Sequence, residues 1–490
     1  MAKVSIIGAG IAGLTAGIYA RRSGFDVTIY ESHIIAGGNC TSWRREGYFF
    51  EGGMHWLTGS SEKKPINRIW REVGAINTET RIFNTDPFLC SDCHGERIFL
   101  YRDMDRFQNH LCSVSPEDTK QIKKLFKDIK RFHPVSVPVM DIPFIKTKNK
   151  TPSLIKFLVK IIPALPRMLV LDKISIKDFV LRFRHPAIRF FLSNLVDSDY
   201  DATSLLFTLA CFTSGDGGYV EGGALKMAQN MAESFIKAGG IIRYKTKIDR
   251  VVVKGNRIYA LQTGNEIINT DSVIISSDTL MAETLFDEGL RENWLKQMRR
   301  KTALVVNTFI TLGVAADLSS LPAGILCALE KPFDHAGITV DNVTIRNYSG
   351  FEKYAPPGST AMTVLIMGDT YDYWKQAKED GLYEQCKQEL VNAIVSRLEE
   401  QYPLIKGKAV FRDAATPLTY ERYCGTYHGS WMTKTLPGQG RMAYPFKSKT
   451  IRGLYFAGQR IQPPGGLPGA LVTGRTAAQY LCRDFHIPFC

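Results

Sequence analysis

The residues best suited to chemistry are glycines near the start of the chain. A Gly-x-Gly-x-x-Gly motif spans residues 8–13, directly after the apolar run at residues 4–7. In such a motif the first glycine permits a tight turn, the second lets the backbone approach a pyrophosphate, and the third allows close helix packing. The helix that follows offers unpaired N–H groups to the phosphates. The residues expected to bind there are Gly8, Gly10, Ile11, Ala12 and Gly13.

An acidic residue completes this motif. A second apolar run at residues 26–30 ends in Glu31, 18 residues after Gly13, with Ser32 next to it. A carboxylate at this position accepts hydrogen bonds from ribose hydroxyls and repels the 2′-phosphate of NADP. The order of strand, glycines, helix, strand and acid therefore predicts a Rossmann-like dinucleotide site, although it does not by itself separate FAD from NAD.

Two further glycine-rich segments favour FAD. Gly37, Gly38 and Asn39 follow shortly after Glu31, and such a second loop of close approach suits a flavin that lies extended through the domain. Near the other end of the chain, the apolar run at 454–458 leads into the segment Pro-Pro-Gly-Gly-Leu-Pro-Gly-Ala and a helix expected from about Thr473 to Cys482. Glycines before a helix again place N–H groups near an anion or the flavin edge.

Taken with Phe-Glu-Gly-Gly-Met-His-Trp at residues 50–56, these motifs resemble the phytoene desaturase, carotene isomerase and retinol saturase family of amine-oxidase-like flavoproteins. The Gly-Met-His-Trp variant is closer to the isomerase and saturase branch. The resemblance implies bound FAD, with the backbone of Ile248 meeting the adenine. The other cofactor-binding residues that it implies are Gly37, Gly38, Asn39, Gly53, Met54, His55, Gly458, Gly466, Leu467, Pro468 and Gly469.

Two residues are catalytic candidates through this resemblance. His55 would lie near the flavin ring and could donate or take a proton; the alternative is a structural hydrogen bond beside the flavin. Tyr423 lies in the segment 415–423, which matches a family segment on the substrate side; the alternative is a surface position. Glu51 is expected to hold ribose or a backbone N–H group rather than to act in catalysis.

The expected activity follows from the family. It is an FAD-dependent oxidoreductase that acts on C–C or C=C bonds of a hydrophobic polyene-like substrate, such as a carotenoid or retinoid, by desaturation, saturation or isomerisation. FAD supplies the redox chemistry and the protein supplies positioning. Two alternatives stay open: a flavin-dependent oxidase of an amine or other polar small molecule, and a flavin-binding protein without turnover.

The expected fold class is α/β, with a discontinuous Rossmann-like domain and a mixed substrate domain. Residues 1–110, 215–290 and 445–490 would form the FAD-binding domain. The substrate domain would combine a mostly helical part at 110–215 with a sheet and covering helices at 290–445, one of them at 383–401.

Residues 144–171 combine apolar side chains with lysines, including Lys148 and Lys150, and Pro163 and Pro166 break any long helix. This pattern fits helices that lie in a lipid interface. The alternative is a buried helix pair of the substrate domain with a solvated lysine edge.

Composition limits the remaining choices. Hydrophobic residues are 44% and charged residues 22% of the 490, which is ordinary for a folded protein and argues against disorder or a coiled coil. The net charge is +14, but the basic residues are spread and no nucleic-acid module occurs, so a nucleic-acid partner is not expected. Ten scattered cysteines, no secretory signal and no spanning apolar run predict a cytoplasmic protein, with contact to the inner face of the cell membrane as one option.

One motif is discounted. Cys90 to His94 spell Cys-x-x-Cys-His, the c-type haem attachment pattern. The flanking apolar residues favour two strands of a hairpin with its turn at 92–95, and no metal site is expected.

Overall fold

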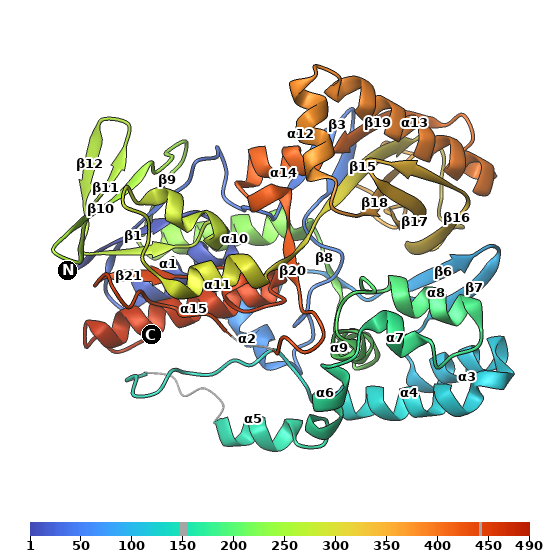
Figure 1. Ribbon diagram of the computed structural model, residues 1–490, viewed down its shortest axis with the longest axis horizontal. Helices are drawn as coiled ribbons and strands as arrows, with labels where there is room; N and C mark the ends of the chain where they lie inside the picture. The colour runs from blue at the N-terminus through green and yellow to red at the C-terminus, as the bar shows by residue number, and fades with distance from the viewer. Residues whose placement is uncertain (148–153, 441–442) are drawn as a thin grey trace.

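The computed structural model describes residues 1–147, 154–440 and 443–490. Strands from distant parts of the chain form a five-stranded sheet in the order β21-β13-β1-β2-β9, and every neighbouring pair is parallel. Its strands are β1 (Lys3–Ile7), β2 (Asp26–Tyr30), β9 (Ile241–Arg243), β13 (Ser272–Ile275) and β21 (Leu454–Phe456). The sheet confirms a Rossmann-like layer built from discontinuous segments (Figure 1).

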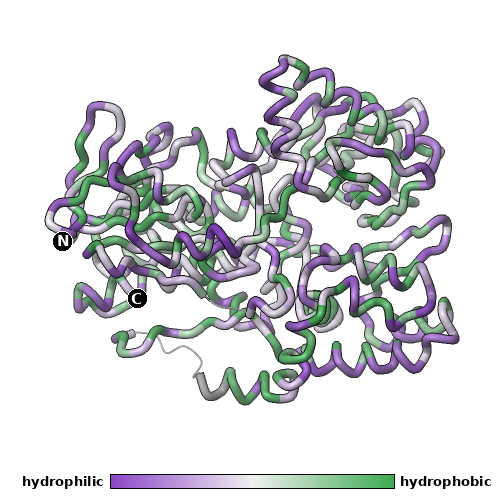
Figure 2. The backbone as a smooth tube through the Cα atoms, in the orientation of Figure 1, coloured by the Kyte–Doolittle hydropathy of each residue, from purple (hydrophilic) through white to green (hydrophobic). Residues whose placement is uncertain are grey.

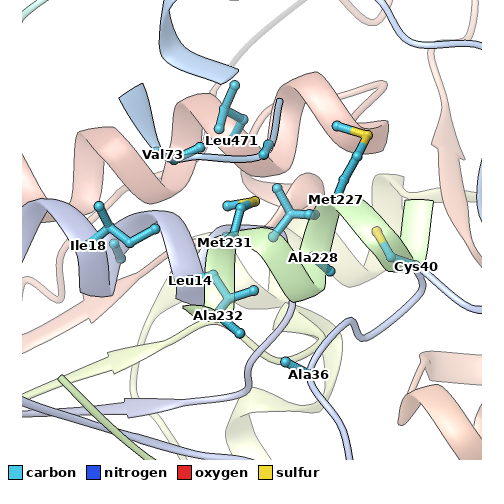
Figure 3. Packing of buried hydrophobic residues seen from close by; sticks show 14 of the residues in the cluster. Leu14, Ile18, Ala36, Cys40, Val73, Met227, Ala228, Met231, Ala232 and Leu471 are labelled. Atoms are coloured by element: carbon cyan, nitrogen blue, oxygen red, sulfur yellow. The ribbon is translucent and has the colours of Figure 1, made fainter. Parts of the chain in front are cut away.

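Three helices pack together beside this sheet, and Figure 3 shows their buried contact. They are α1 (Ile11–Arg22), α10 (Gly223–Lys237) and α15 (Gly466–Asp484). A Cβ at Gly474 would lie 2.3 Å from the carbonyl oxygen of Ala12, so α15 approaches α1 backbone to backbone. The helix α15 begins earlier than predicted, because its first turn tolerates Pro468, whose missing N–H would have no partner there.

A seven-stranded sheet forms the second layer, in the order β19-β15-β18-β17-β16-β6-β7. Its strands are β6 (Leu89–Cys93), β7 (Glu96–Leu100), β15 (Asn307–Val314), β16 (Gly324–His335), β17 (Ile338–Asn347), β18 (Thr360–Met367) and β19 (Ala409–Ala415). The neighbouring helices are α12 (Tyr371–Glu379) and α13 (Tyr383–Gln401). The helix predicted at 383–401 is confirmed, and its buried residues pack with the sheet in one apolar cluster.

The hairpin of β6 and β7 confirms the prediction for the Cys-x-x-Cys-His segment, with its turn at His94 and Gly95, both at positive φ. It lies within the predicted FAD-binding segment 1–110, but β6 pairs in parallel with β16 of the seven-stranded sheet. Alternating apolar residues predict a hairpin and leave open which sheet it joins.

The described residues of 110–215 are mostly helical and lie beside the seven-stranded sheet (Figure 1). Their helices are α3 (Met104–Val114), α4 (Thr119–Phe132), α5 (Leu154–Ile161), α6 (Leu165–Leu171), α7 (Ile176–Val180), α8 (Pro186–Asn194) and α9 (Ala202–Thr213). Within the described ranges, no helix is both long and apolar enough to cross a membrane.

Smaller elements complete the chain and carry several site residues. The short strands are β3 (Ser42–Arg45), β4 (Tyr48–Glu51), β5 (Ile82–Phe83), β8 (Tyr219–Val220), β10 (Arg250–Lys254), β11 (Arg257–Thr263), β12 (Glu266–Asn269), β14 (Ala303–Val305) and β20 (Met432–Lys434). The remaining α-helices are α2 (Pro65–Glu72), α11 (Asn293–Lys301) and α14 (Pro417–Cys424).

Candidate functional site

The first glycine motif joins β1 to α1 as predicted, and its glycines have different structural roles. A Cβ at Gly13 would lie 2.0 Å from the carbonyl oxygen of Gly8, so close packing requires this glycine. A Cβ at Gly10 would have no neighbour nearer than 3.9 Å. Gly10 caps α1 without any side-chain hydrogen bond, so the first N–H groups of the helix have no protein cap. The space at Gly10 is therefore available to a phosphate.

The second glycine pair lies against the first motif. Gly10 and Gly37 form an isolated parallel bridge, and the Gly37 amide donates to the carbonyl of Ala9 at 3.0 Å. A Cβ at Gly38 would lie 3.3 Å from the Cα of Gly10. Two loops that are separate in sequence thus form one cradle walled by backbone, which a side chain would narrow.

Glu31 lies directly beside this cradle. Its Oε2 accepts from the Ala9 amide at 2.7 Å, and its Oε1 accepts from the His33 amide at 2.8 Å. Ser32 is exposed, and its hydroxyl lies 3.3 Å from the carboxylate. Oε1 thus accepts two hydrogen bonds, from the His33 amide and the Ser32 hydroxyl, whereas Oε2 accepts one among the described residues and has a second lone pair for a ribose hydroxyl.

The segment after β9 passes Glu31, because the Thr246 amide donates to the Glu31 carbonyl at 2.8 Å. Ile248 is buried two residues later. Among the described residues, neither its amide nor its carbonyl has a hydrogen-bond partner. The backbone of Ile248 is therefore free to meet the edge of an adenine, and its contact with FAD stays a prediction.

The C-terminal motif reaches the same region through Trp431. The Trp431 carbonyl accepts from Gln459 Nε2 at 2.7 Å and from Asn39 Nδ2 at 3.5 Å. The Gly466 amide donates to Gln459 Oε1 at 3.0 Å. One carbonyl thus connects the early glycine loop with the start of α15. The indole Nε1 of Trp431 is buried and has no partner among the described residues.

The N-cap of α15, Gly465, offers no side-chain hydrogen bond, but the Gly466 amide is already bound by Gln459, which leaves the Leu467 amide as the one of the pair without a partner among the described residues. Pro468 has no N–H group, and the Gly469 amide bonds to the Gly465 carbonyl at 3.3 Å. The Gly458 amide donates to Thr473. Gly469 and Gly458 therefore shape the turn with their amides rather than offer them to a ligand.

Glu51 is an acceptor for backbone groups, as expected. Its Oε1 accepts from the Gly53 amide at 2.8 Å, and its Oε2 from the Ser42 hydroxyl at 2.9 Å and the Ala224 amide at 3.1 Å. Burial raises the pKa of Glu51 to about 7, against these hydrogen bonds, which lower it. A Cβ at Gly223 would overlap Oε2, so only glycine fits at that position. Glu51 thereby fixes the turn that carries Met54 and His55.

His55 is half-buried on this turn, while Met54 before it is buried. Arg346 of β17 donates from Nη2 to the His55 carbonyl at 3.3 Å. Burial, assisted by the positive charge of Arg346, lowers the pKa of His55 to about 4. The imidazole is therefore neutral at neutral pH. Any proton that it donates or accepts is then exchanged at a ring nitrogen of this neutral form.

An aromatic cluster adjoins His55. Trp56 lies 6.1 Å from Phe88 and 5.3 Å from Phe212 between ring centroids, and these two phenylalanines stack at 3.9 Å. The three rings come from the turn after β4, the segment before β6, and α9. They give the His55 region an apolar boundary.

Tyr423 lies elsewhere. It is 53% exposed on α14, and its ring lies 6.1 Å from that of His33, close to Glu31. His55 has other neighbours, so the structure does not bring the two predicted catalytic residues together among the described contacts. A catalytic role for Tyr423 stays a prediction that this position does not support.

Three residues of the site were not predicted. Gln459 directly follows Gly458, and this adjacency could have identified it. Trp431 is an isolated aromatic, and Arg346 is a basic residue in an otherwise ordinary strand, so neither gives a sequence signal. Both contacts depend on chain segments that meet only in the folded protein.

The site as a whole fits FAD. The backbone cradle and uncapped helix start suit the pyrophosphate, Glu31 suits a ribose, Ile248 suits the adenine, and the unpartnered Trp431 indole is a donor near the C-terminal motif. Among the described residues, no group of His, Cys, Asp and Glu side chains is arranged to hold a metal ion.

Comparisons with known proteins agree with this assignment. The family model described as "Flavin containing amine oxidoreductase" matches residues 11–482. Prolycopene isomerase of Daucus carota is 22% identical, over 98% of this chain and 80% of its own. All-trans-retinol 13,14-reductase of Danio rerio is 21% identical, over 98% and 86% of the two chains. A phytoene desaturase (lycopene-forming) of Pantoea ananas is 23% identical, over 99% and 100%.

A solved structure shares the fold. A variant of putrescine oxidase superposes with a TM-score of 0.63 at 15% identity, over 98% of this chain and 99% of its own. At this identity the likeness shows the architecture alone, and that architecture agrees with the Rossmann-like layer and mixed sheet. The family match, which covers nearly the whole chain, establishes that the protein belongs to the flavin-containing amine oxidoreductases and is an FAD-dependent oxidoreductase.

Proposed function

We propose that the protein acts on C–C or C=C bonds of a hydrophobic polyene-like substrate, such as a carotenoid or retinoid. The observation that carries this proposal is the apolar boundary of the His55 region, where the half-buried Trp56 packs on the buried rings of Phe88 and Phe212. An extended hydrocarbon gains free energy by leaving water for such surroundings. Relatives named for lycopene, phytoene and retinol substrates, each matched over at least 98% of this chain, support it.

Bound FAD would supply the redox chemistry, by exchange of a hydride equivalent. A polyene has few polar handles, so the contribution of the protein is mainly to position the reacting bond and exclude water. Glu51 holds the turn before His55 through the Gly53 amide, and Arg346 holds the His55 carbonyl. His55 can then hold or move a proton at a neutral ring nitrogen.

The three reaction types differ in the direction of electron flow. The Gly-Met-His-Trp variant at His55 favours saturation or isomerisation over desaturation. Anaerobic absorption spectra of the FAD-loaded protein separate them. Bleaching of the flavin bands by a partly saturated polyene identifies a desaturase. Reoxidation of the reduced protein by a more unsaturated polyene identifies a saturase. Isomer conversion that requires the reduced state, without net reoxidation, identifies an isomerase.

The same experiment tests the alternatives. Bleaching by a primary amine, with no response to any polyene, would identify an amine oxidase and contradict the proposal. Flavin bands that respond to neither class, but change normally with dithionite and air, would identify a flavoprotein with a different substrate. Flavin that stays inert even to dithionite would identify a protein in which FAD is structural.

We also propose that the protein meets its substrate at a membrane surface. Figure 2 shows that the coloured part of α5 is largely hydrophobic, whereas α4 is more hydrophilic. Among the side chains that the structure describes, α5, α6 and their connection carry six exposed aliphatic ones, 42–60% accessible: Leu158, Val159, Ile162, Leu165, Leu169 and Val170. Residues 148–153 of the predicted lipid-facing segment lie outside the described ranges.

The sequence of this region carries charges that suit anionic headgroups. The segment 144–184 contains ten Lys or Arg residues and two Asp residues, and α4 adds six basic residues and one acidic residue. Basic side chains that flank an apolar face are typical of helices lying in a lipid interface. The ten cysteines are all free, which supports a reducing cytoplasmic location at the inner face of the membrane.

A further inference from the structure

Two arginines lie over the same aromatic ring, and they use their hydrogen-bond donors differently. The guanidinium carbons of Arg102 and Arg346 lie 5.7 Å and 5.6 Å from the ring centroid of Phe88. Arg102 donates three side-chain hydrogen bonds to backbone carbonyls, at 2.7–3.2 Å. Arg346 donates one, to the His55 carbonyl at 3.3 Å. Among the described residues, Arg346 therefore leaves four of its five N–H donors unused, whereas Arg102 leaves two.

The charge of Arg346 also lacks a partner. Its side chain is only 9% exposed, and no carboxylate forms an ion pair with it among the described residues. Two other buried arginines of the chain, Arg460 and Arg475, each bind an aspartate at 2.7 Å. A buried guanidinium without a counter-charge is costly, and such groups concentrate at functional sites where a ligand completes them.

The adjacent strand leaves room for this guanidinium. Gly324 of β16 is paired with Arg346 across the sheet. A Cβ at Gly324 would lie 2.9 Å from Nη1 of Arg346. Gly324 has no positive φ, so the backbone does not require a glycine there. The absence of a side chain at Gly324 instead leaves space for the guanidinium of Arg346.

We infer that Arg346 binds an anionic oxygen of the substrate, and that the substrate is a polyene with a carboxylate or similar acidic end group. This inference rests on the proposed function and narrows its substrate class. A hydrocarbon offers no partner to a guanidinium, whereas a carboxylate accepts two parallel N–H hydrogen bonds from it. Arg346 is thus the charged anchor, and Trp56, the half-buried member of the aromatic cluster, would contact the apolar part of the same molecule.

All-trans-retinoate and its methyl ester are a matched pair of probes, because they share the polyene and differ in charge. Each is titrated into FAD-loaded protein, and the change in the flavin absorption spectrum gives the Kd. The wild-type protein should bind retinoate at least about tenfold more tightly than the ester, as expected for a charge-assisted hydrogen bond. Arg346→Gln should remove this preference and leave the Kd of the ester within about twofold. Arg346→Lys should keep part of the preference.

Arg102→Gln is the matched control, since it removes a cation over the same ring whose donors serve the backbone. It should keep the preference for retinoate. If Arg346→Gln does not fold, Gly324→Ala gives the same information, because it displaces Nη1 and leaves the charge; it should reduce the preference.

Equal Kd values in the wild-type protein, or a preference that survives Arg346→Gln or Gly324→Ala, would overturn the inference while the proposed function stands. Failure of both probes to bind, in protein that holds FAD, would also overturn the inference, and the anaerobic titrations with other polyenes would then decide whether the proposed function stands.

Discussion

Gly10 and Gly37 form an isolated parallel β-bridge, which makes two glycine motifs one backbone surface. Gly13 contributes to this arrangement in another way, because its Cα packs against the carbonyl of Gly8. The first motif therefore contains one glycine that leaves space for a ligand and one that the apoprotein itself needs. Substitutions to alanine separate the two roles.

Gly10→Ala should fold normally and lose FAD. The added methyl group would meet nothing nearer than 3.9 Å in the protein, and φ is −75° at this position, which alanine adopts freely. It would occupy the space that a pyrophosphate needs. The measurement is the ratio of flavin to protein absorbance after purification and after incubation with FAD, together with the melting temperature of the apoprotein.

Gly13→Ala should instead fail at folding, since its methyl group would lie 2.0 Å from a carbonyl oxygen. Such overpacking costs about 1–3 kcal/mol or more. Gly350→Ala is the control, because Gly350 faces open space without a positive φ. Stoichiometric FAD in purified Gly10→Ala would contradict the phosphate assignment.

Glu51→Gln should destabilise the protein by about 1–3 kcal/mol, the cost of leaving a buried polar group unsatisfied. All three groups that face the Glu51 carboxylate are donors, so the amide of glutamine would place an NH₂ group against at least one of them. Urea unfolding of the FAD-loaded protein measures the change. Glu79→Gln, at an exposed position, should have no effect, and equal midpoints for both variants would rule out this role of Glu51.

The sequence predicted those features that depend on local order. The glycine motif, Glu31 and the helix at 383–401 each follow from residues close together in the chain. The hairpin Leu89–Leu100 was predicted as a hairpin, but its edge pairing with β16 arises from segments more than 200 residues apart. Arg346 and Trp431 acquire their roles only through His55 and Asn39, which lie on other segments. Contacts between residues that lie far apart in the chain leave no signal in a single sequence.

His55 should make the stability of the protein depend on pH. Its folded-state pKa of about 4 is below the usual 6.5, so the unfolded chain binds more protons between these values. Stability should therefore rise with pH from 4 to 6.5, by up to about 1.4 kcal/mol per pH unit from this residue. Glu51, with a raised pKa, opposes this trend, so the comparison uses a variant.

The free energy of unfolding is measured against pH for wild-type protein and His55→Gln, both FAD-loaded. The difference in unfolding free energy between the two proteins isolates the effect of His55. This difference should vary with pH several-fold more steeply below pH 6 than above it. His33→Gln is the control, because this partly exposed histidine lies beside Tyr423. Parallel curves for wild-type protein and His55→Gln would show that His55 is protonated normally.

The apolar surface of α5 and α6 should bind anionic vesicles. Partial burial of aliphatic side chains in the interface contributes about 25 cal/mol per Å², and the surrounding lysines add attraction to anionic lipid. Val159→Ser/Ile162→Ser/Leu169→Ser should weaken sedimentation with phosphatidylserine-containing vesicles about tenfold or more, and higher salt should weaken the wild-type protein. Val410→Ser/Ile267→Ser removes equally exposed side chains elsewhere, and should sediment like wild type. Equal sedimentation of the two variants, or a patch variant that changes only the oligomeric state, would mean that this surface meets protein rather than lipid.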